Sequence, residues 1–87
     1  MEFDFDPEKS RGNLEKHDID FETAQSLWLD ERRVTFDTPF QDEKRGGVIA
    51  AYRERLWCAI YTIRNQSIRI ISVRRARENE ESIYFQF

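Results

Sequence analysis

The sequence contains few of the residues that form disulfides and metal sites, with one cysteine and one histidine in 87 residues. Glycine and proline are also scarce, at three and two residues. The single Cys58 excludes an intrachain disulfide, and its place in the apolar run LWCAIY predicts a small buried side chain rather than a catalytic thiol. One histidine and one cysteine cannot supply a zinc-ligand set, and the carboxylates show no EF-hand spacing. We therefore expect neither a metal site nor a cofactor.

Long apolar runs and export signals are also lacking. No segment approaches the roughly 18 apolar residues of a membrane span, and the acidic start MEFDFD has neither the basic nor the apolar region of a signal peptide. We expect a cytoplasmic protein without membrane contact. The length fits a single domain, residues 1–87, and an aromatic content of 14% supplies the bulk for one core.

Charge is plentiful but unevenly distributed. Thirteen Asp and Glu against five Lys and Arg give residues 1–43 a balance of −8, whereas nine Lys and Arg against one Glu give residues 44–77 a balance of +8. The last ten residues add −3, which is also the net charge. A basic half of this kind is typical of a protein with a phosphate-bearing partner. Pairing between the acidic and basic halves, or a solvated charged surface, is the alternative.

Two helices are predicted near the N-terminus. Asp6 and Pro7 form a helix start, and Asp18 can end a largely polar surface helix over residues 7–17. Asp20 can cap a second helix, whose apolar residues recur at helical spacing and should pack against a sheet. These residues are Phe21, Ala24, Leu27 and Trp28.

Strand character begins at residue 34. Strands are predicted over residues 34–36, 48–53, 56–63 and 68–74, with a polar connection containing Pro39 after the first and a helix over residues 76–86 at the end. Phe3 and Phe5 alternate with acids, which suits a short edge strand or an anchor for the N-terminus. Asn65 is the expected left-handed residue of the last turn. The predicted fold class is α+β: two N-terminal helices, a four-stranded mainly antiparallel sheet and a C-terminal helix.

Arginine on these strands is the main chemical signal. A guanidinium stays charged and binds phosphate oxygens in a bidentate fashion, so grouped arginines can hold a nucleic-acid backbone and stabilise a charged transition state. For Arg69, an ion pair with one of the N-terminal acids is the alternative. The candidates lie on strands or at their ends: Arg53, Arg64, Arg69, Arg74 and Arg75.

The face that each arginine occupies depends on the last turn. A two-residue turn pairs Trp57 with Arg74 across the last two strands, and Arg69 and Arg75 then share one face while Arg74 points to the other. A one-residue bulge would reverse this assignment.

Proton transfer has fewer candidates. His17 is the only side chain that ordinarily titrates near neutrality, which suits a general acid or base, although a helix C-terminus is also a common structural position for histidine. Tyr61 and Tyr84 could stack on a base or donate a proton, with burial in the core as the alternative.

Two stretches of the sequence resemble one protein family. FDFDPEKSRGNLEKHDIDFETA contains the patterns D-P-x-K and N-x-x-K-H, and YTIRNQSIRIISVRRARENEESIY contains the strand–turn–strand pattern I-R-I-I-S-x-R-x-A. Both are similar to BrnT-type toxins of bacterial type II toxin–antitoxin modules, which share the RelE-like ribonuclease fold. Asp18 and Asn65 stand where that family usually has glycine, and residues 39–56 match it less well.

The resemblance implies a metal-independent endoribonuclease toxin that arrests growth by cutting RNA through attack of a ribose 2′-hydroxyl on the adjacent phosphate. It also implies neutralisation by a BrnA-like DNA-binding antitoxin, so operator DNA would be contacted only through the toxin–antitoxin complex. Our hypothesis assigns catalysis to one set of residues and RNA binding to another; a non-catalytic module that binds RNA or a protein, such as a decayed toxin, is the alternative. The catalytic set is Arg69, Arg74, Arg75 and His17, and the RNA-binding set is Arg53, Arg64, Lys16 and Tyr61.

Overall fold

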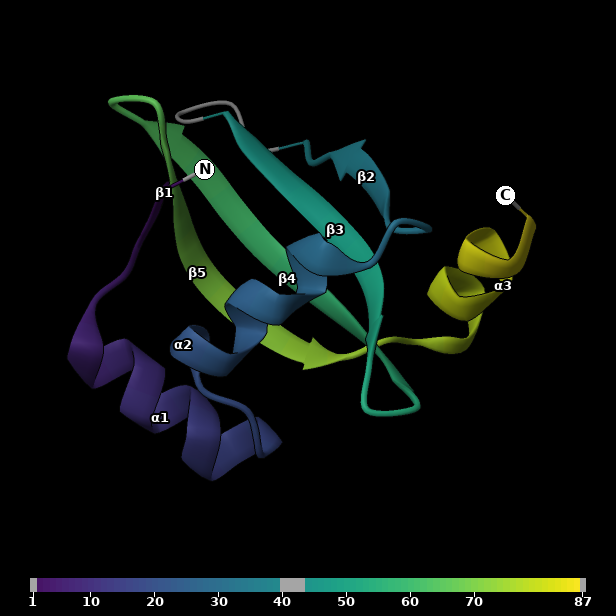
Figure 1. The fold of residues 1–87 in the computed structure, drawn as a ribbon, viewed down its shortest axis with the longest axis horizontal. Coiled ribbons are helices and arrows are strands. Elements are labelled where there is room, and N and C mark those ends of the chain that lie inside the picture. The colour runs from purple at the N-terminus through teal and green to yellow at the C-terminus, as the bar shows by residue number, and fades with distance from the viewer. Residues whose placement is uncertain (1, 40–43, 87) are drawn as a thin grey trace.

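The computed structural model describes residues 2–39 and 44–86, so part of the polar connection after Pro39 lies outside the described residues. The α+β class predicted from the sequence is confirmed (Figure 1). The elements follow in the order β1 (Glu2–Asp4), α1 (Pro7–His17), α2 (Phe21–Ala24), the 3₁₀ helix η1 (Gln25–Leu29), β2 (Val34–Asp37), β3 (Arg45–Tyr52), β4 (Arg55–Arg64), β5 (Ser67–Arg75) and α3 (Glu78–Gln86).

The sheet has five strands, not the four predicted, in the order β1-β5-β4-β3-β2. The additional strand β1 runs parallel to β5, and all other neighbours are antiparallel. A short edge strand at Phe3 was one of two alternatives that the sequence left open, and β1 confirms it. Its parallel pairing with β5 was not predicted, because that partner lies at the far end of the sequence. Phe3 secures β1 by packing edge-to-face on Trp28, with 5.1 Å between the ring centroids.

Helices cover both faces of the sheet, but unequally. α1, α2 and η1 lie over one face, whereas α3 reaches only one end of the other (Figure 1). Among the described residues, none of the helices is long and apolar enough to span a bilayer. The larger core includes Phe21, Leu27, Val48, Ala59, Ile70 and Val73, and the smaller one beneath α3 includes Ile49, Leu56 and Tyr84.

The second predicted helix is divided into a short α-helix and a 3₁₀ helix. Asp20 caps it as expected, because its Oδ1 accepts a hydrogen bond from the Thr23 N–H at 2.7 Å. Phe21 and Leu27 are buried, and Trp28 is half-buried against Tyr61, with 5.4 Å between the ring centroids. Within η1, Leu27 is buried against the sheet whereas Leu29 is exposed.

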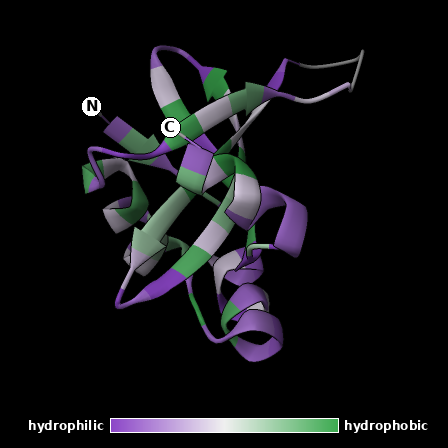
Figure 2. Cartoon of the chain, turned by 90° about the vertical axis from the view of Figure 1, so that its right-hand side faces the viewer, coloured by the Kyte–Doolittle hydropathy of each residue, from purple (hydrophilic) through white to green (hydrophobic). Residues whose placement is uncertain are grey.

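Helix α1 begins and ends where the sequence predicts. The Asp6 carboxylate accepts a hydrogen bond from the Glu8 N–H, and Asp18 ends the helix in the left-handed conformation with φ 63°. Figure 2 colours α1 as almost wholly hydrophilic, in contrast to the strands. An apolar face therefore cannot hold this helix in place.

Two buried polar side chains attach α1 instead. The Asn13 amide donates to the Ile19 carbonyl at 2.7 Å and accepts from the Val73 N–H at 3.2 Å. The Ser10 hydroxyl accepts from the Phe21 N–H at 2.8 Å. Asn13 thereby binds a backbone carbonyl of the α1–α2 connection and a backbone N–H of β5. This N–H, of Val73, lies beyond the residues of β5 that pair with β1.

Both hairpin turns place two non-glycine residues at positive φ. Arg53 and Glu54 have φ 50° and 65° between β3 and β4, and Asn65 and Gln66 have φ 50° and 69° between β4 and β5. Two-residue turns with this pattern match the twist of the strands, although glycine and asparagine adopt it at the lowest cost. The left-handed Asn65 is confirmed. The strand predicted to include Arg53 ends one residue earlier, because Arg53 is part of the turn.

A bulge in β5 reverses the predicted faces of its arginines. Ile70 pairs with Tyr61 but Ser72 pairs with Ile60, so the intervening Ile71 has no partner in β4. Beyond the bulge, Arg74 lies opposite Cys58 and Arg75 lies opposite Trp57.

The prediction that Arg69 and Arg75 share a face is therefore wrong. Arg69 and Arg74 lie on the face that carries α3, and Arg75 lies on the face that carries the N-terminal helices, because one extra residue inverts the alternation.

We expect Asn13→Ala to lower the free energy of unfolding by roughly 2 to 4 kcal/mol, because it leaves a buried carbonyl and a buried N–H without partners. Urea unfolding monitored by circular dichroism measures this change. Asn79→Ala, at an exposed position of α3, is the matched control and should have little effect. Equal stability of the two variants would contradict the role of Asn13.

Candidate functional site

A cleft of about 490 Å³ opens between the first two helices and the β3–β4 hairpin. Asp18 turns the chain out of α1 at one side of the cleft, and Arg53 begins the hairpin turn at the other. Acidic, basic and apolar groups therefore meet in one depression. Its lining residues are Leu14, Asp18, Ile19, Asp20, Thr23, Tyr52, Arg53, Arg55 and Trp57.

Exposed guanidinium groups mark the sheet side of this cleft. The Arg53 guanidinium lies 5.4 Å from the centre of the Tyr52 ring, and the Arg75 guanidinium lies 5.6 Å from the centre of the Trp57 ring. Arg55 is exposed at the start of β4 and lines the cleft as well. Trp57 is itself fixed by a 3.2 Å hydrogen bond from its Nε1–H to the Tyr52 carbonyl. Cation–π contacts with fixed rings orient two of the three guanidiniums.

The structure brings several of the predicted site residues to this end of the molecule. The end of α1, the β3–β4 hairpin and the end of β5 lie close together in Figure 1. Arg53 lines the cleft and Arg75 contacts one of its lining residues. Lys16 and His17 are exposed in the last turn of α1, immediately before the lining residue Asp18, but do not line the cleft themselves.

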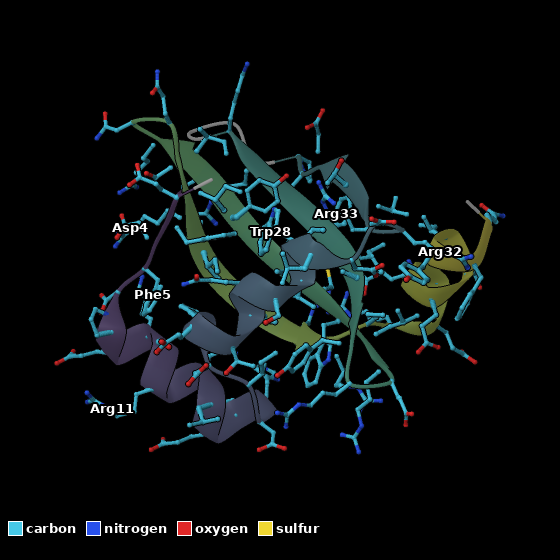
Figure 3. All side chains as sticks on the ribbon, in the orientation of Figure 1. Asp4, Phe5, Arg11, Trp28, Arg32 and Arg33 are labelled. Atoms are coloured by element: carbon cyan, nitrogen blue, oxygen red, sulfur yellow. The ribbon has the colours of Figure 1, made fainter. Side chains whose placement is uncertain are left out.

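Other predicted residues lie elsewhere. Arg69 forms an ion pair with Asp4 of β1 at 2.6 Å, the alternative that the sequence left open. Arg64 ends β4, next to the turn at the opposite end of the sheet. Tyr61 is half-buried over Gly46 and against Trp28, and burial raises the pKa of its hydroxyl. Figure 3 labels Asp4 and Trp28 and shows them on the β1 side of the sheet and over its middle, respectively.

Arg74 is bound by a carboxylate on the α3 side. Its Nη1 and Nη2 donate to the two Glu80 carboxylate oxygens at 2.8 and 2.9 Å, and Glu80 Oε1 also accepts from the Arg77 N–H. The hydrogen bonds from Arg74 lower the pKa of Glu80 from the ordinary 4.5 to about 2. Burial raises the pKa of the adjacent Cys58 thiol to about 11, which agrees with the prediction that Cys58 is a buried hydrophobe.

A second polar contact holds the other end of α3. The Tyr84 hydroxyl donates to Asp30 Oδ2 at 2.7 Å, and the same oxygen accepts from the Ala51 N–H at 2.8 Å. Tyr84, which the sequence left open as a base-stacking or core residue, is therefore buried in the small core beneath α3.

Sequence reasoning missed Arg55, Tyr52 and Asp18 as cleft residues. Arg55 and Tyr52 flank a turn, and a face cannot be assigned to them until the register of β3 and β4 is known. Asp18 was recognised only as a helix end. A second signal was available at this position, because the side chain of a left-handed residue projects beside the end of the helix.

A further pocket of about 410 Å³ lies at the opposite end of the sheet. Its lining also combines acidic, basic and apolar residues: Asp37, Thr38, Lys44, Arg45, Gly46, Tyr61 and Ile63. Within residues 2–39 and 44–86, no group of three or more His, Cys, Asp and Glu side chains is placed to hold a metal ion.

The fold defines a small α+β domain whose cleft is lined by two arginines and two aspartates. Residues 5–80 match the family model described as "Ribonuclease toxin, BrnT, of type II toxin-antitoxin system". The chain therefore belongs to the BrnT family of ribonuclease toxins, as its motifs indicated. A comparison with curated protein sequences found no match.

The Glu80 ion pair predicts how stability depends on pH. Since the pKa of Glu80 is lower in the folded state than its ordinary 4.5, its stabilising contribution is complete above pH 4.5 and is lost as the pH falls towards 2. Glu80→Gln should be less stable than the parent at pH 7 and should lose less stability between pH 4.5 and 2. Unfolding by urea at several pH values measures both effects. The exposed Glu78→Gln is the control, and an identical pH profile for both variants would contradict the assignment.

Proposed function

We propose that this chain is a metal-independent endoribonuclease, the toxin of its toxin–antitoxin pair, and that it cleaves RNA at the cleft beside the β3–β4 hairpin. The observation that carries this proposal is the group of three exposed guanidiniums, those of Arg53, Arg55 and Arg75. Within the described part of the chain they form no ion pair. Their positive charge is therefore available to a phosphate group from outside the molecule.

In the proposed reaction, the ribose 2′-oxygen attacks the adjacent phosphorus while the bond from phosphorus to the 5′-oxygen of the next nucleotide breaks. The products are a 2′,3′-cyclic phosphate and a 5′-hydroxyl end. Negative charge develops on the phosphoryl oxygens, and Arg53, Arg55 and Arg75 bind these oxygens more strongly in the transition state than in the substrate.

Proton transfer is assigned to the end of α1. The 2′-hydroxyl must lose a proton and the leaving 5′-oxygen must gain one. Neutral His17 can accept the first proton, and the Lys16 ammonium beside it can donate the second. Both are exposed in the last turn of α1, which ends at the cleft residue Asp18.

Two other arginines of the sequence-based hypothesis, Arg69 and Arg74, have structural roles in this proposal. Arg69 holds β1 through Asp4, and Arg74 holds α3 through Glu80. A guanidinium with both ends of its fork bound to a carboxylate has little capacity left for a phosphate. Loss of Arg74 should therefore reduce activity mainly through reduced stability.

The partner proposed from the family is a BrnA-like antitoxin that neutralises the toxin and binds operator DNA, so that the toxin contacts DNA only within that complex. Arrest of growth by the chain alone, relieved when the antitoxin is co-expressed, would support this part of the proposal.

We expect Arg75→Ala, and the double replacement of Arg53 and Arg55 by Ala, each to lower the cleavage rate by about a hundredfold or more. The assay is cleavage of an end-labelled single-stranded RNA by the purified chain, with and without EDTA. Arg32→Ala is the matched control, because this exposed arginine lies close to α3, away from the cleft (Figure 3).

Three outcomes would contradict parts of this proposal. Unchanged cleavage in the cleft variants would exclude the assigned site, and loss of cleavage in EDTA would exclude a metal-independent reaction. RNA binding without any cleavage would favour the non-catalytic alternative. In that case the salt dependence of binding should still become shallower in the arginine variants, since each phosphate contact releases counterions.

A further inference from the structure

Asp18 is placed in the cleft at a position where a carboxylate is unfavourable. It ends α1 with φ 63° and ψ 30°, and its N–H donates to the Leu14 carbonyl at 2.9 Å. Glycine and asparagine adopt this conformation more readily than aspartate. The negative end of the helix dipole also disfavours a carboxylate there.

The Asp18 carboxylate has no partner in the part of the chain that the structure describes. Within the described residues its side chain makes no hydrogen bond and no ion pair, and it is exposed to the cleft. The other carboxylate of the cleft, Asp20, is engaged by the Thr23 N–H, which lowers its pKa. Of the two carboxylates that line the cleft, Asp18 is thus the one without a hydrogen-bond partner among the described residues.

The neighbours of Asp18 suit a flat, partly apolar ligand. Leu14 is 45% exposed although it is apolar, and it lines the same cleft. The half-buried ring of Tyr52 contributes further apolar surface. Arg53 and Arg55 stand close enough to line the same space, so a nucleotide could place its base near Leu14 and its phosphate near the arginines.

The chemistry of a carboxylate distinguishes between the bases. It only accepts hydrogen bonds, and its two oxygens suit two parallel N–H donors. Guanine offers such a pair at N1–H and N2–H on its Watson–Crick edge. Adenine and cytosine place a ring nitrogen acceptor beside their amino group, and uracil places a carbonyl on each side of its single N–H.

We propose that the cleft holds one base of the RNA substrate and that Asp18 selects guanine. The inference rests on the proposed function in taking RNA as the ligand, but it concerns base recognition rather than cleavage. A carboxylate at this position is unfavourable for the left-handed backbone conformation, and its charge repels the phosphate groups of RNA. Its presence is explained if it binds the base.

Binding of the four mononucleotides GMP, AMP, CMP and UMP to the purified chain tests this directly, by calorimetry. We expect the parent chain to bind GMP at least about tenfold more tightly than the other three, as one bidentate contact allows. Asp18→Asn and Asp18→Gly should remove this preference. Both residues tolerate positive φ, so the variants should fold at least as stably as the parent, which thermal unfolding will verify.

Glu15→Gln is the matched control, since it removes one negative charge from an exposed position of α1 outside the cleft and should keep the preference for GMP. Equal binding of all four nucleotides by the parent chain would overturn the inference. So would a uniform rise in affinity for all four in the Asp18 variants, which would indicate simple charge repulsion. Selective GMP binding by a chain that does not cleave RNA would leave this inference standing and contradict only the ribonuclease proposal.

Discussion

The position of α1 depends on the amide side chain of Asn13. This helix has almost no apolar face, so its attachment relies on the two hydrogen bonds that Asn13 makes to the Ile19 carbonyl and the Val73 N–H, supported by Ser10. In a buried setting such bonds fix direction as well as distance. The cleft has the end of α1 as one side and the β3–β4 hairpin as the other. Asn13 therefore sets the distance between the groups assigned to proton transfer and those assigned to phosphate binding.

The arginines divide into two groups that the charge pattern alone does not distinguish. Arg69 and Arg74 bind carboxylates and attach β1 and α3 to the sheet, whereas Arg53, Arg55 and Arg75 form no ion pair in the part of the chain that the structure describes. The acidic and basic halves of the sequence thus pair in part, and Arg53, Arg55 and Arg75 lie at the end of the sheet where β3 turns into β4. A chain of net charge −3 can in this way present a locally basic surface to RNA.

Local signals allowed much of the fold to be predicted. Asp6, Pro7, Asp18 and Asn65 act through the backbone of their own neighbourhood, and each is found at the helix end or turn that the sequence indicates. The parallel pairing of β1 with β5 and the position of the bulge at Ile71 could not be predicted, because strand pairing between distant segments and packing across the sheet decide them. The site was predicted only in part for the same reason. The importance of arginine was apparent from the sequence. The strand register, which brings Arg55 to the cleft and Arg74 beneath α3, is a property of the assembled sheet.

The bulge has a consequence for comparing members of this family. Arg74 and Arg75 are adjacent and chemically identical, yet one binds Glu80 on the α3 side and the other lies against Trp57 on the opposite side. If Ile71 paired regularly with Ile60 instead of bulging, Arg74 would lie opposite Trp57, and the two arginines would exchange faces with no change in composition or charge. Alignments of homologues should therefore be anchored on the bulge and on the partners of each arginine. Matching arginines by their order in the sequence alone would equate residues that face opposite sides of the sheet.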